Sequence, residues 1–182
     1  MAKRVFTAMN DNIVLVGMPG GGKSAVGRVL AKRLQRTLVE TDAETENAAG
    51  MSIADVFAAH GEAHFRELET TVLTRALSES AQVVSTGGGI VLSAENRALM
   101  RKSAWVAYLT APVSLLCGRL KADSAARPLL PEISADAVEE LLRQREKLYQ
   151  QTAHVAVAQH AKDTPADVAE KTCAGLRCFM PL

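Results

Sequence analysis

Hydrophobic positions follow two patterns that alternate along the chain. Short continuous apolar runs, such as residues 13–16, are typical of strands that are buried on both faces of a sheet. Longer segments in which apolar residues recur every three or four positions, as at Val26, Leu30 and Leu34, predict amphipathic helices. The runs predict strands at 12–17, 37–41, 82–86, 104–110 and 154–158. The periodic segments predict helices at 22–34, about 52–80, 94–102, 112–121, 134–151 and 165–177.

This alternation of strands and helices predicts an α/β fold, in which a five-stranded parallel sheet lies between two layers of helices. No repeat or linker interrupts the pattern, so we expect the 182 residues to form a single domain with a core over about 12–178. Ligands of such sheets bind outside the carboxyl ends of the strands. The residues that directly follow each strand are therefore the first candidates for a functional site.

A glycine-rich stretch, "GMPGGGKSAVG" at 17–27, follows the first expected strand and opens the first expected helix. Gly17 is followed after four residues by Gly22, Lys23 and Ser24, which is the spacing of the loop that cradles phosphates in nucleoside triphosphate enzymes. Its backbone N–H groups and the helix N-terminus favour an anion. In such a loop the lysine reaches the terminal phosphates and the serine hydroxyl binds Mg²⁺. The stretch therefore predicts a nucleoside triphosphate site.

Three further features follow other strands. Glu40 and Asp42 come after the second strand, and the triple glycine Gly87 to Gly89 comes after the third. Between the fourth and fifth strands, "DSAARPLLPE" at 123–132 contains too many prolines for a continuous helix, and we expect a mobile cover over the site there. Each of these three features alone also fits an ordinary turn or loop. Together with the glycine-rich stretch they make four features on one sheet edge, which favours a functional site.

Charge and cysteine content narrow the functional classes. Lysine and arginine number 21 against 20 acidic residues, a net charge of +1, so we expect no general affinity for nucleic acid. The three cysteines, Cys117, Cys173 and Cys178, form no CxxC pair, which indicates a reduced, cytoplasmic chain. No signal peptide or membrane span is expected from the apolar runs, and we expect a monomer that acts on a small molecule.

The chain resembles the shikimate kinases, which belong to the nucleoside-monophosphate-kinase-like group of P-loop enzymes. The motifs that carry the resemblance are, in order, "GMPGGGKSAVGR", "ETDAETE", "GEAHFRELE", "STGGG" and "ARPLLP", between about Asn12 and Val168. The resemblance implies a P-loop NTPase fold with an acceptor-binding region at about 40–70 and a lid at about 121–132. It also implies transfer of a phosphoryl group from ATP to the 3-hydroxyl of shikimate, giving shikimate 3-phosphate and ADP, in chorismate and aromatic amino-acid biosynthesis.

The resemblance also implies roles for individual residues. The implied catalytic residues are Lys23, Asp42 and Arg127. ATP would be bound by Gly20, Gly21, Gly22, Lys23, Ser24, Ala25, Arg119 beside the adenine, and Arg127 from the lid. Shikimate would be bound by Asp42, Arg66, Gly87, Gly88, Gly89 and Arg145, the last at its carboxylate. Mg²⁺ would be bound by Ser24 and, through water, by Glu40.

Two positions depart from the family pattern. Glu40 stands where the family commonly has aspartate, and a contact through water tolerates the longer side chain better than direct ligation would. Lys147 stands where the family commonly has proline in the motif that here reads "REKLY".

The residues' own chemistry leads to a broader class than the resemblance does. Phosphoryl transfer requires cations on the phosphate path and a carboxylate at the acceptor hydroxyl, which Lys23, Arg127 and Asp42 would supply. Glu69, three residues after Arg66 on an expected helix, can orient that guanidinium. The additional arginines favour an acceptor with its own anionic group, so the residues predict an ATP-dependent kinase of a small anionic polyol.

Two alternatives remain open from the sequence. A gluconate kinase or a nucleotide kinase would share the loop, the sheet and the lid, with different motifs on the acceptor side. A non-enzymatic nucleotide-binding module could keep Lys23 while losing the acid and the lid arginine; the presence of Asp42 and Arg127 argues against it.

Overall fold

A computed structural model describes residues 12–122 and 134–178. The strands are β1 (Asn12–Val16), β2 (Thr37–Glu40), β3 (Gln82–Ser85), β4 (Ala104–Thr110) and β5 (Val155–Ala158). The helices are α1 (Lys23–Leu34), α2 (Thr41–Ala49), α3 (Ile53–Ser78), α4 (Ala94–Ser103), α5 (Val113–Ala122), α6 (Ala135–Thr152) and α7 (Pro165–Arg177), with a 3₁₀ turn, η1, at Ile90–Leu92.

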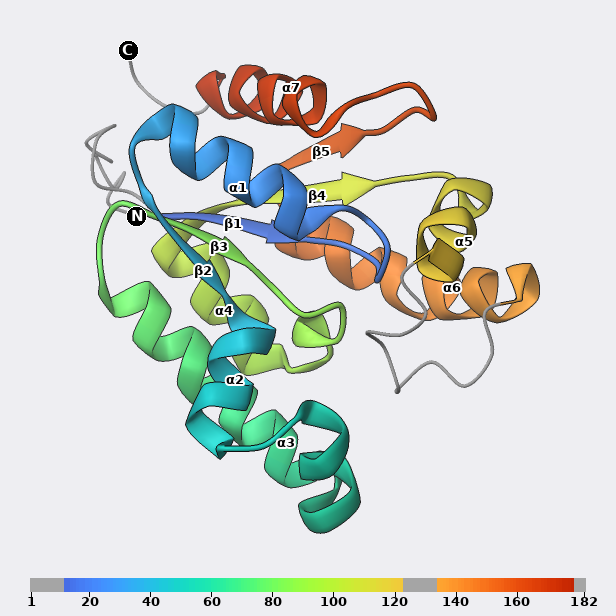
Figure 1. Cartoon of the computed structure of the whole chain (residues 1–182). Coiled ribbons are helices and arrows are strands. Elements are labelled where there is room, and N and C mark those ends of the chain that lie inside the picture. The colour runs from blue at the N-terminus through green and yellow to red at the C-terminus, as the bar shows by residue number, and fades with distance from the viewer. Residues whose placement is uncertain (1–11, 123–133, 179–182) are drawn as a thin grey trace.

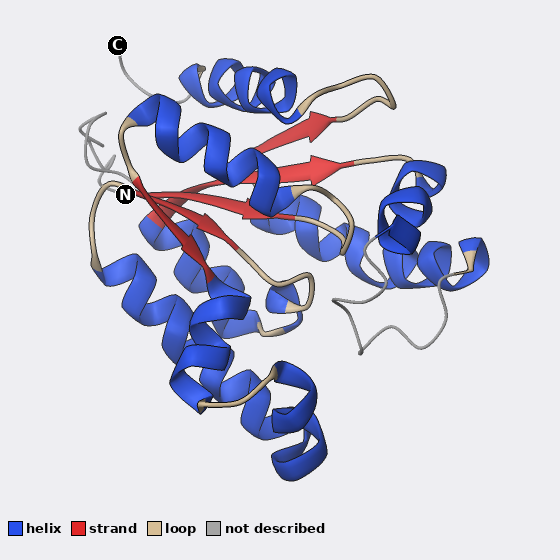
Figure 2. Ribbon diagram, in the orientation of Figure 1, coloured by secondary structure: helices blue, strands red, loops and turns tan. Residues whose placement is uncertain are grey.

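The five strands form one parallel sheet in the order β2-β3-β1-β4-β5. β1 lies at the centre, where it pairs in parallel with β3 on one side and β4 on the other. All five expected strands are confirmed to within one residue at each end. Because the strands are parallel, their carboxyl ends lie along one edge of the sheet, as the arrowheads in Figure 2 show. The segments that follow β1, β2 and β3 therefore start side by side.

Helices cover both faces of the sheet, with α1 and α7 on one face and α3, α4 and α6 on the other (Figure 1). Successive residues of β1 point to opposite faces, so that Ile13 and Leu15 belong to the core under α1 and α7 while Val14 and Val16 belong to the core on the opposite face. Both sets are at most 1% exposed. The continuous apolar run that predicted a strand buried on both faces is thus explained, and the predicted three-layer fold is confirmed.

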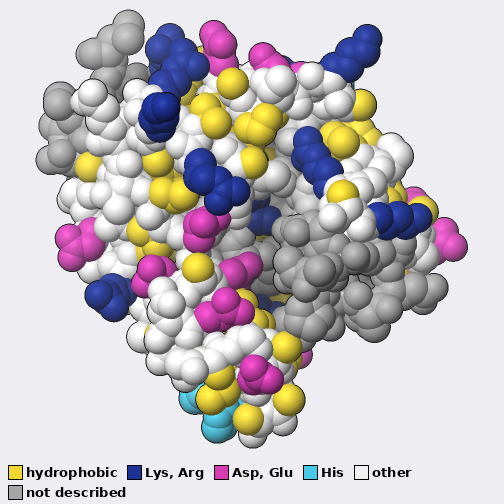
Figure 3. Space-filling model, in the orientation of Figure 1, with side chains coloured by type: hydrophobic (Ala, Val, Ile, Leu, Met, Phe, Trp, Pro, Cys, Tyr) yellow, Lys and Arg dark blue, Asp and Glu magenta, His cyan; other side chains and the backbone are white. Residues whose placement is uncertain are grey.

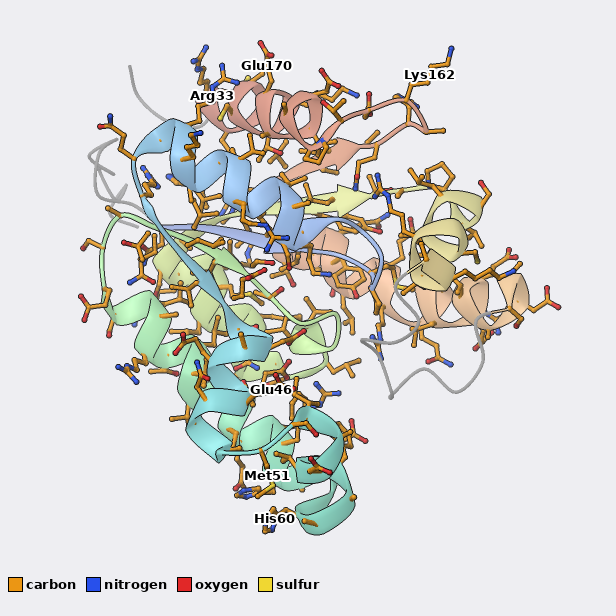
Figure 4. All side chains as sticks on the ribbon, in the orientation of Figure 1. Arg33, Glu46, Met51, His60, Lys162 and Glu170 are labelled. Carbon is orange, nitrogen blue, oxygen red and sulfur yellow. The ribbon has the colours of Figure 1, made fainter. Side chains whose placement is uncertain are left out.

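The region after β2 differs from the sequence expectation. No helix is expected at 41–49, yet α2 forms there, and its only buried residues are the polar Thr41 and Thr45. A helix that buries so little apolar surface leaves no amphipathic pattern in the sequence. The following helix, α3, is kinked at Gly61, whose φ of 79° is left-handed. Figure 4 shows Glu46, Met51 and His60 at the end of the molecule formed by α2 and the first part of α3.

Part of the predicted lid lies outside the described residues. Of the segment 121–132, only Lys121 and Ala122 are described, at the end of α5, and Arg127 is not among the described residues. Within 12–122 and 134–178, none of the helices has the length and apolar character needed to cross a membrane.

Candidate functional site

The glycine-rich loop turns sharply between β1 and α1. Gly20 and Gly22 have φ values of 76° and 77°, in the left-handed region that favours glycine. Gly17 has φ of 148°, and a Cβ there would lie 2.6 Å from the carbonyl oxygen of Leu109. The N-cap residue Gly22 has no side chain that could cap α1, so the first-turn amides point out of the helix N-terminus, an arrangement that favours an anion. The loop and first turn contain the residues predicted to bind the nucleotide, Gly20, Gly21, Gly22, Lys23, Ser24 and Ala25.

Lys23 is held inside this turn. Its side chain is buried, and the Nζ atom donates hydrogen bonds to the carbonyl oxygens of Gly17 and Met18, both at 2.9 Å. The ammonium group thus lies against the loop backbone, next to the helix N-terminus. Lysine is a compact point charge with three donors, so at this position it can serve both the loop carbonyls and a neighbouring phosphate oxygen.

Two residues from distant elements brace the loop from the side of β5. Arg119 of α5 donates from one guanidinium nitrogen to the carbonyl oxygen of Gly20 at 3.3 Å and to the side-chain oxygen of Gln159 at 3.0 Å. Gln159, which follows β5 and is buried, donates its amide to the carbonyl oxygen of Gly21 at 2.9 Å. Arg119 is among the residues predicted to bind ATP, whereas Gln159 is not, although its position directly after a strand is a signal that could have suggested it.

Oxygen-bearing side chains lie where α1 meets the ends of β2 and β3. The hydroxyl oxygen of Ser24 lies 3.4 Å from that of Ser85, the last residue of β3, and either can donate. Glu40 is the last residue of β2, and its carboxylate forms an ion pair with Arg28 at 3.6 Å. Arg28 lies on α1, one helical turn after Ser24. Hydroxyl and carboxylate oxygens suit Mg²⁺. Across 12–122 and 134–178 there is no group of three or more His, Cys, Asp or Glu that could hold a metal by itself.

The triple glycine lies between the phosphate loop and the acidic and basic residues that follow β2. A Cβ on Gly87 would overlap the carboxylate of Asp42, and one on Gly88 would lie 2.7 Å from Cδ of Pro19 in the loop. A Cβ on Gly89 would lie 2.5 Å from the Arg66 guanidinium. Three side chains therefore approach this backbone so closely that a Cβ at any of the three glycines would require a neighbour to shift. The structure brings together the expected Asp42, Arg66 and Gly87 to Gly89.

Asp42 stands in the first turn of α2, close to the helix N-terminus. Acidic side chains gather on this face of the molecule over α2 (Figure 3). The helix itself is anchored to the triple glycine, because the amide of Gly87 donates to the hydroxyl of Thr41 at 3.0 Å. Asp42, which follows β2, and Gly87, which follows β3, therefore lie next to each other at the carboxyl edge of the sheet.

Arg66 is fixed by two carboxylates on α3. It donates to Glu69 at 2.8 Å and to Glu62 at 3.0 Å, and Glu69 is only 2% exposed. Burial raises the pKa of the Glu69 carboxyl, while its hydrogen bond and ion pair with Arg66 act in the opposite direction. The charge of Asp42 also raises this pKa and that of Arg145 lowers it, so both groups lie within electrostatic reach of Glu69. The ion pair expected from the spacing of Arg66 and Glu69 is confirmed.

Arg145 reaches the same region from α6, which runs without interruption through Lys147. One turn later, the wholly buried Tyr149 donates its hydroxyl to the carbonyl oxygen of Gly88 at 2.6 Å. Tyr149 is the last residue of the motif "REKLY" and is not among the predicted site residues. A polar contact between residues 61 positions apart leaves no local sequence signal.

The whole arrangement has two halves that meet at the triple glycine. On one side lie the glycine-rich loop, the buried Lys23 and hydroxyl groups suited to a hydrated cation. On the other lie Asp42, Arg66 and Arg145, a carboxylate and two guanidinium groups. A loop with the P-loop spacing next to side chains that can bind a small anion is the arrangement of P-loop enzymes that move a phosphoryl group to a small molecule.

Comparison with known proteins identifies the family within this class. The model of the shikimate kinase family matches residues 19–176. The shikimate kinase of Synechococcus sp. (strain JA-3-3Ab) is 43% identical over 175 residues, which cover 93% of this chain and 91% of that protein. The solved structure of shikimate kinase from Acinetobacter baumannii in complex with shikimate has a TM-score of 0.87 and 36% identity, covering 93% of this chain and 94% of that one. The chain belongs to the shikimate kinase family.

A gluconokinase structure helps to separate fold from family. The gluconokinase of Sinorhizobium meliloti 1021 matches with a TM-score of 0.55 and 18% identity, covering 93% of both chains. That likeness shows the shared fold alone. Gluconate kinase is one of the alternatives that the sequence leaves open. A gluconokinase shares the architecture of this chain, whereas the family match supports the shikimate kinases.

Proposed function

We propose that the protein transfers the γ-phosphoryl group of ATP to the 3-hydroxyl of shikimate, giving shikimate 3-phosphate and ADP for chorismate and aromatic amino-acid biosynthesis. The observation that carries the proposal is the double contact of the triple glycine. Gly88 packs on Pro19 of the phosphate loop, while Gly87 and Gly89 contact Asp42 and Arg66. An acceptor resting on this backbone would lie beside the donor loop and would touch the carboxylate and the guanidinium at once.

On the donor side, the loop amides and the N-terminus of α1 would bind the phosphates of ATP. Lys23 would neutralise the charge that develops on the transferred group, which is the main demand of this reaction. Arg119 contacts the loop through Gly20, and from there its guanidinium could also stack on the adenine. The role that the sequence gives Arg127 stays a prediction.

The oxygen donors around Ser24 fit a magnesium ion. P-loop enzymes bind Mg²⁺ through one or two protein oxygens together with phosphates and water, so a cluster of three carboxylates is not needed. Ser24 would ligate the ion, and Ser85 and Glu40 would hold its water molecules, since their oxygens lie at the adjoining strand ends. The ion would neutralise charge on the β- and γ-phosphates.

On the acceptor side, Arg66 and Arg145 would bind the carboxylate and hydroxyls of shikimate, and Asp42 would accept a hydrogen bond from the reacting hydroxyl. Glu62 and Glu69 hold the Arg66 guanidinium in one orientation before the acceptor arrives, which lowers the entropy cost of binding. Asp42 would orient the hydroxyl and take up its proton as the bond to phosphorus forms.

A coupled ADP-release assay tests the proposal. The purified protein is supplied with MgATP and, in separate reactions, with shikimate, gluconate or a nucleoside monophosphate. Turnover should be fast with shikimate and near background with the other acceptors, and Lys23→Ala should reduce it to background while the variant keeps its thermal unfolding transition. Equal rates in the presence and absence of shikimate would contradict the proposal, as would a preference for gluconate or a nucleotide.

A further inference from the structure

Tyr149 lies at a junction of three parts of the proposed site. Its side chain is wholly buried in α6, and the hydroxyl donates a 2.6 Å hydrogen bond to the carbonyl oxygen of Gly88. The same hydroxyl oxygen lies 3.9 Å from the sulfur of Met18 in the phosphate loop. The ring stacks on that of Tyr108 of β4, with centroids 5.0 Å apart and an interplanar angle of 21°. A rigid ring and a short hydrogen bond thus fix the hydroxyl in one place.

Arg145 is the third partner of this hydroxyl. It lies one helical turn before Tyr149 on α6, and both its charge and its hydrogen bond to the phenol oxygen act to lower the tyrosine pKa. Burial has the larger, opposite effect, so the pKa of Tyr149 lies well above its ordinary value. The phenol therefore keeps its proton at neutral pH, and it can donate to Gly88 while its oxygen accepts from Arg145.

Gly88 in turn is held from its other side. A Cβ at this residue would lie 2.7 Å from Cδ of Pro19, so the Gly88 backbone is packed between the donor loop and the Tyr149 hydroxyl. Its neighbours Gly87 and Gly89 contact Asp42 and Arg66. A small displacement of Gly88 would change the position of the acceptor residues relative to the phosphate loop.

We propose that Tyr149 is a positioning residue that sets the distance and orientation of the acceptor-side residues relative to the phosphate loop, through Gly88 and Arg145. The inference rests on the proposed phosphoryl transfer. Near-attack geometry tolerates little displacement, since a shift of about 1 Å can cost on the order of 10²-fold in rate. Loss of the hydroxyl would leave the Gly88 carbonyl without its donor and the Arg145 guanidinium without this acceptor.

The test compares Tyr149→Phe with Tyr108→Phe. Both changes remove one buried phenol oxygen from the same stacked pair of rings, but the Tyr108 hydroxyl is hydrogen bonded to the Thr110 side chain. Steady-state rates are measured with varied acceptor and varied ATP, and the affinity for ADP is measured by calorimetry without acceptor. The acceptor is the one that the wild-type protein phosphorylates fastest, so inactivity towards shikimate would contradict the proposed function alone.

For Y149F we expect the KM for the acceptor to rise about 10-fold, as for loss of one or two buried hydrogen bonds, with a several-fold fall in kcat. The KM for ATP and the affinity for ADP should stay within about twofold of wild type. Y108F should match wild type in all these values. Equal kinetics for the two variants would overturn the inference. A loss of ADP affinity in Y149F would also overturn it, whether the loss is local or arises because the variant does not fold.

Discussion

Gln159 and Arg119 share a hydrogen bond of 3.0 Å beside the phosphate loop, and each also donates to the loop backbone. Arg119 bonds to the carbonyl oxygen of Gly20 and Gln159 to that of Gly21, at 3.3 Å and 2.9 Å. Two consecutive peptide units of the loop are therefore held by side chains that come from α5 and from the segment after β5. Since Gln159 is 2% exposed, its amide has little water to replace a lost partner.

Changing Gln159 to Glu should weaken ATP binding and leave the binding of the acceptor shikimate nearly unchanged. The carboxylate would keep an oxygen for Arg119 but would face the carbonyl oxygen of Gly21 with no hydrogen to donate, which pushes the loop away from its present position. We expect the KM for ATP to rise about 10-fold, equivalent to roughly 1–2 kcal/mol, and the KM for shikimate to change less than about twofold. Initial-rate measurements with each substrate varied in turn check this. A larger rise in the KM for shikimate than in the KM for ATP would show that the Arg119 and Gln159 contacts support acceptor binding instead.

Gly87→Ala should damage the reaction through a clash with Asp42. The new Cβ would overlap the Asp42 carboxylate and lie 3.1 Å from an oxygen of Glu69, so the acid must move. We expect kcat/KM for shikimate to fall by roughly 10²-fold, with ADP affinity unchanged. Gly118→Ala is the matched control, since a Cβ there meets no atom of the described residues within 4 Å and the residue lies in α5. It should leave activity unchanged and add about 0.5–1 kcal/mol to stability. Comparable activity for the two variants would contradict this geometry.

Most of the fold and the donor loop could be predicted from local sequence. The run at 13–16 and the spacing at 17–24 contain their own signals, because a doubly buried strand and a phosphate loop are short, contiguous patterns. Gln159 and Tyr149 could not be found in this way. They act on residues 138 and 61 positions away, Gly21 and Gly88, and such contacts depend on how the sheet brings strand ends together.

Helix α2 shows a second limit of sequence reasoning. Its helical state depends on its position after β2 and on anchoring contacts such as that between Thr41 and Gly87, and it lacks an apolar stripe. The acids at 40 and 42 were expected after a strand, and they are there. Their local conformation was not predictable, because short polar helices depend on tertiary contacts for stability.

Stability should fall below about pH 6.5 because of His154. Its Nδ1 accepts a 3.0 Å hydrogen bond from the amide of Val106, and burial together with the charge of Arg101 lowers its pKa below the ordinary 6.5. The unfolded chain then binds the proton more readily than the folded one. This stabilisation is therefore complete above the unfolded pKa and is lost as the pH falls towards the folded value. Urea unfolding from pH 7.5 to 5.0 measures the effect.

His154→Asn provides the control for this pH dependence, because the asparagine side-chain oxygen can accept from Val106 without titrating. The other histidines are the same in both proteins, so their contributions cancel in the difference. The stability of the wild-type protein relative to H154N should decrease as the pH is lowered. A difference that stays constant from pH 7.5 to 5.0 would contradict the role of His154.

Asp42→Asn should lower kcat and leave ATP binding nearly unchanged. The change keeps the size of the side chain next to Gly87 but removes the negative charge and the ability to take a proton from the acceptor hydroxyl. If the carboxylate acts as base or charge partner in the transition state, kcat should fall by roughly 10²–10⁴-fold. The KM for ATP should barely change, since the lost contact belongs to the acceptor.

Glu40→Gln is the comparison, because an acid that binds Mg²⁺ through water should change the metal dependence of the rate instead. A D42N protein with near-wild-type kcat, or one whose defect disappears at high Mg²⁺, would place the acceptor hydroxyl away from this aspartate.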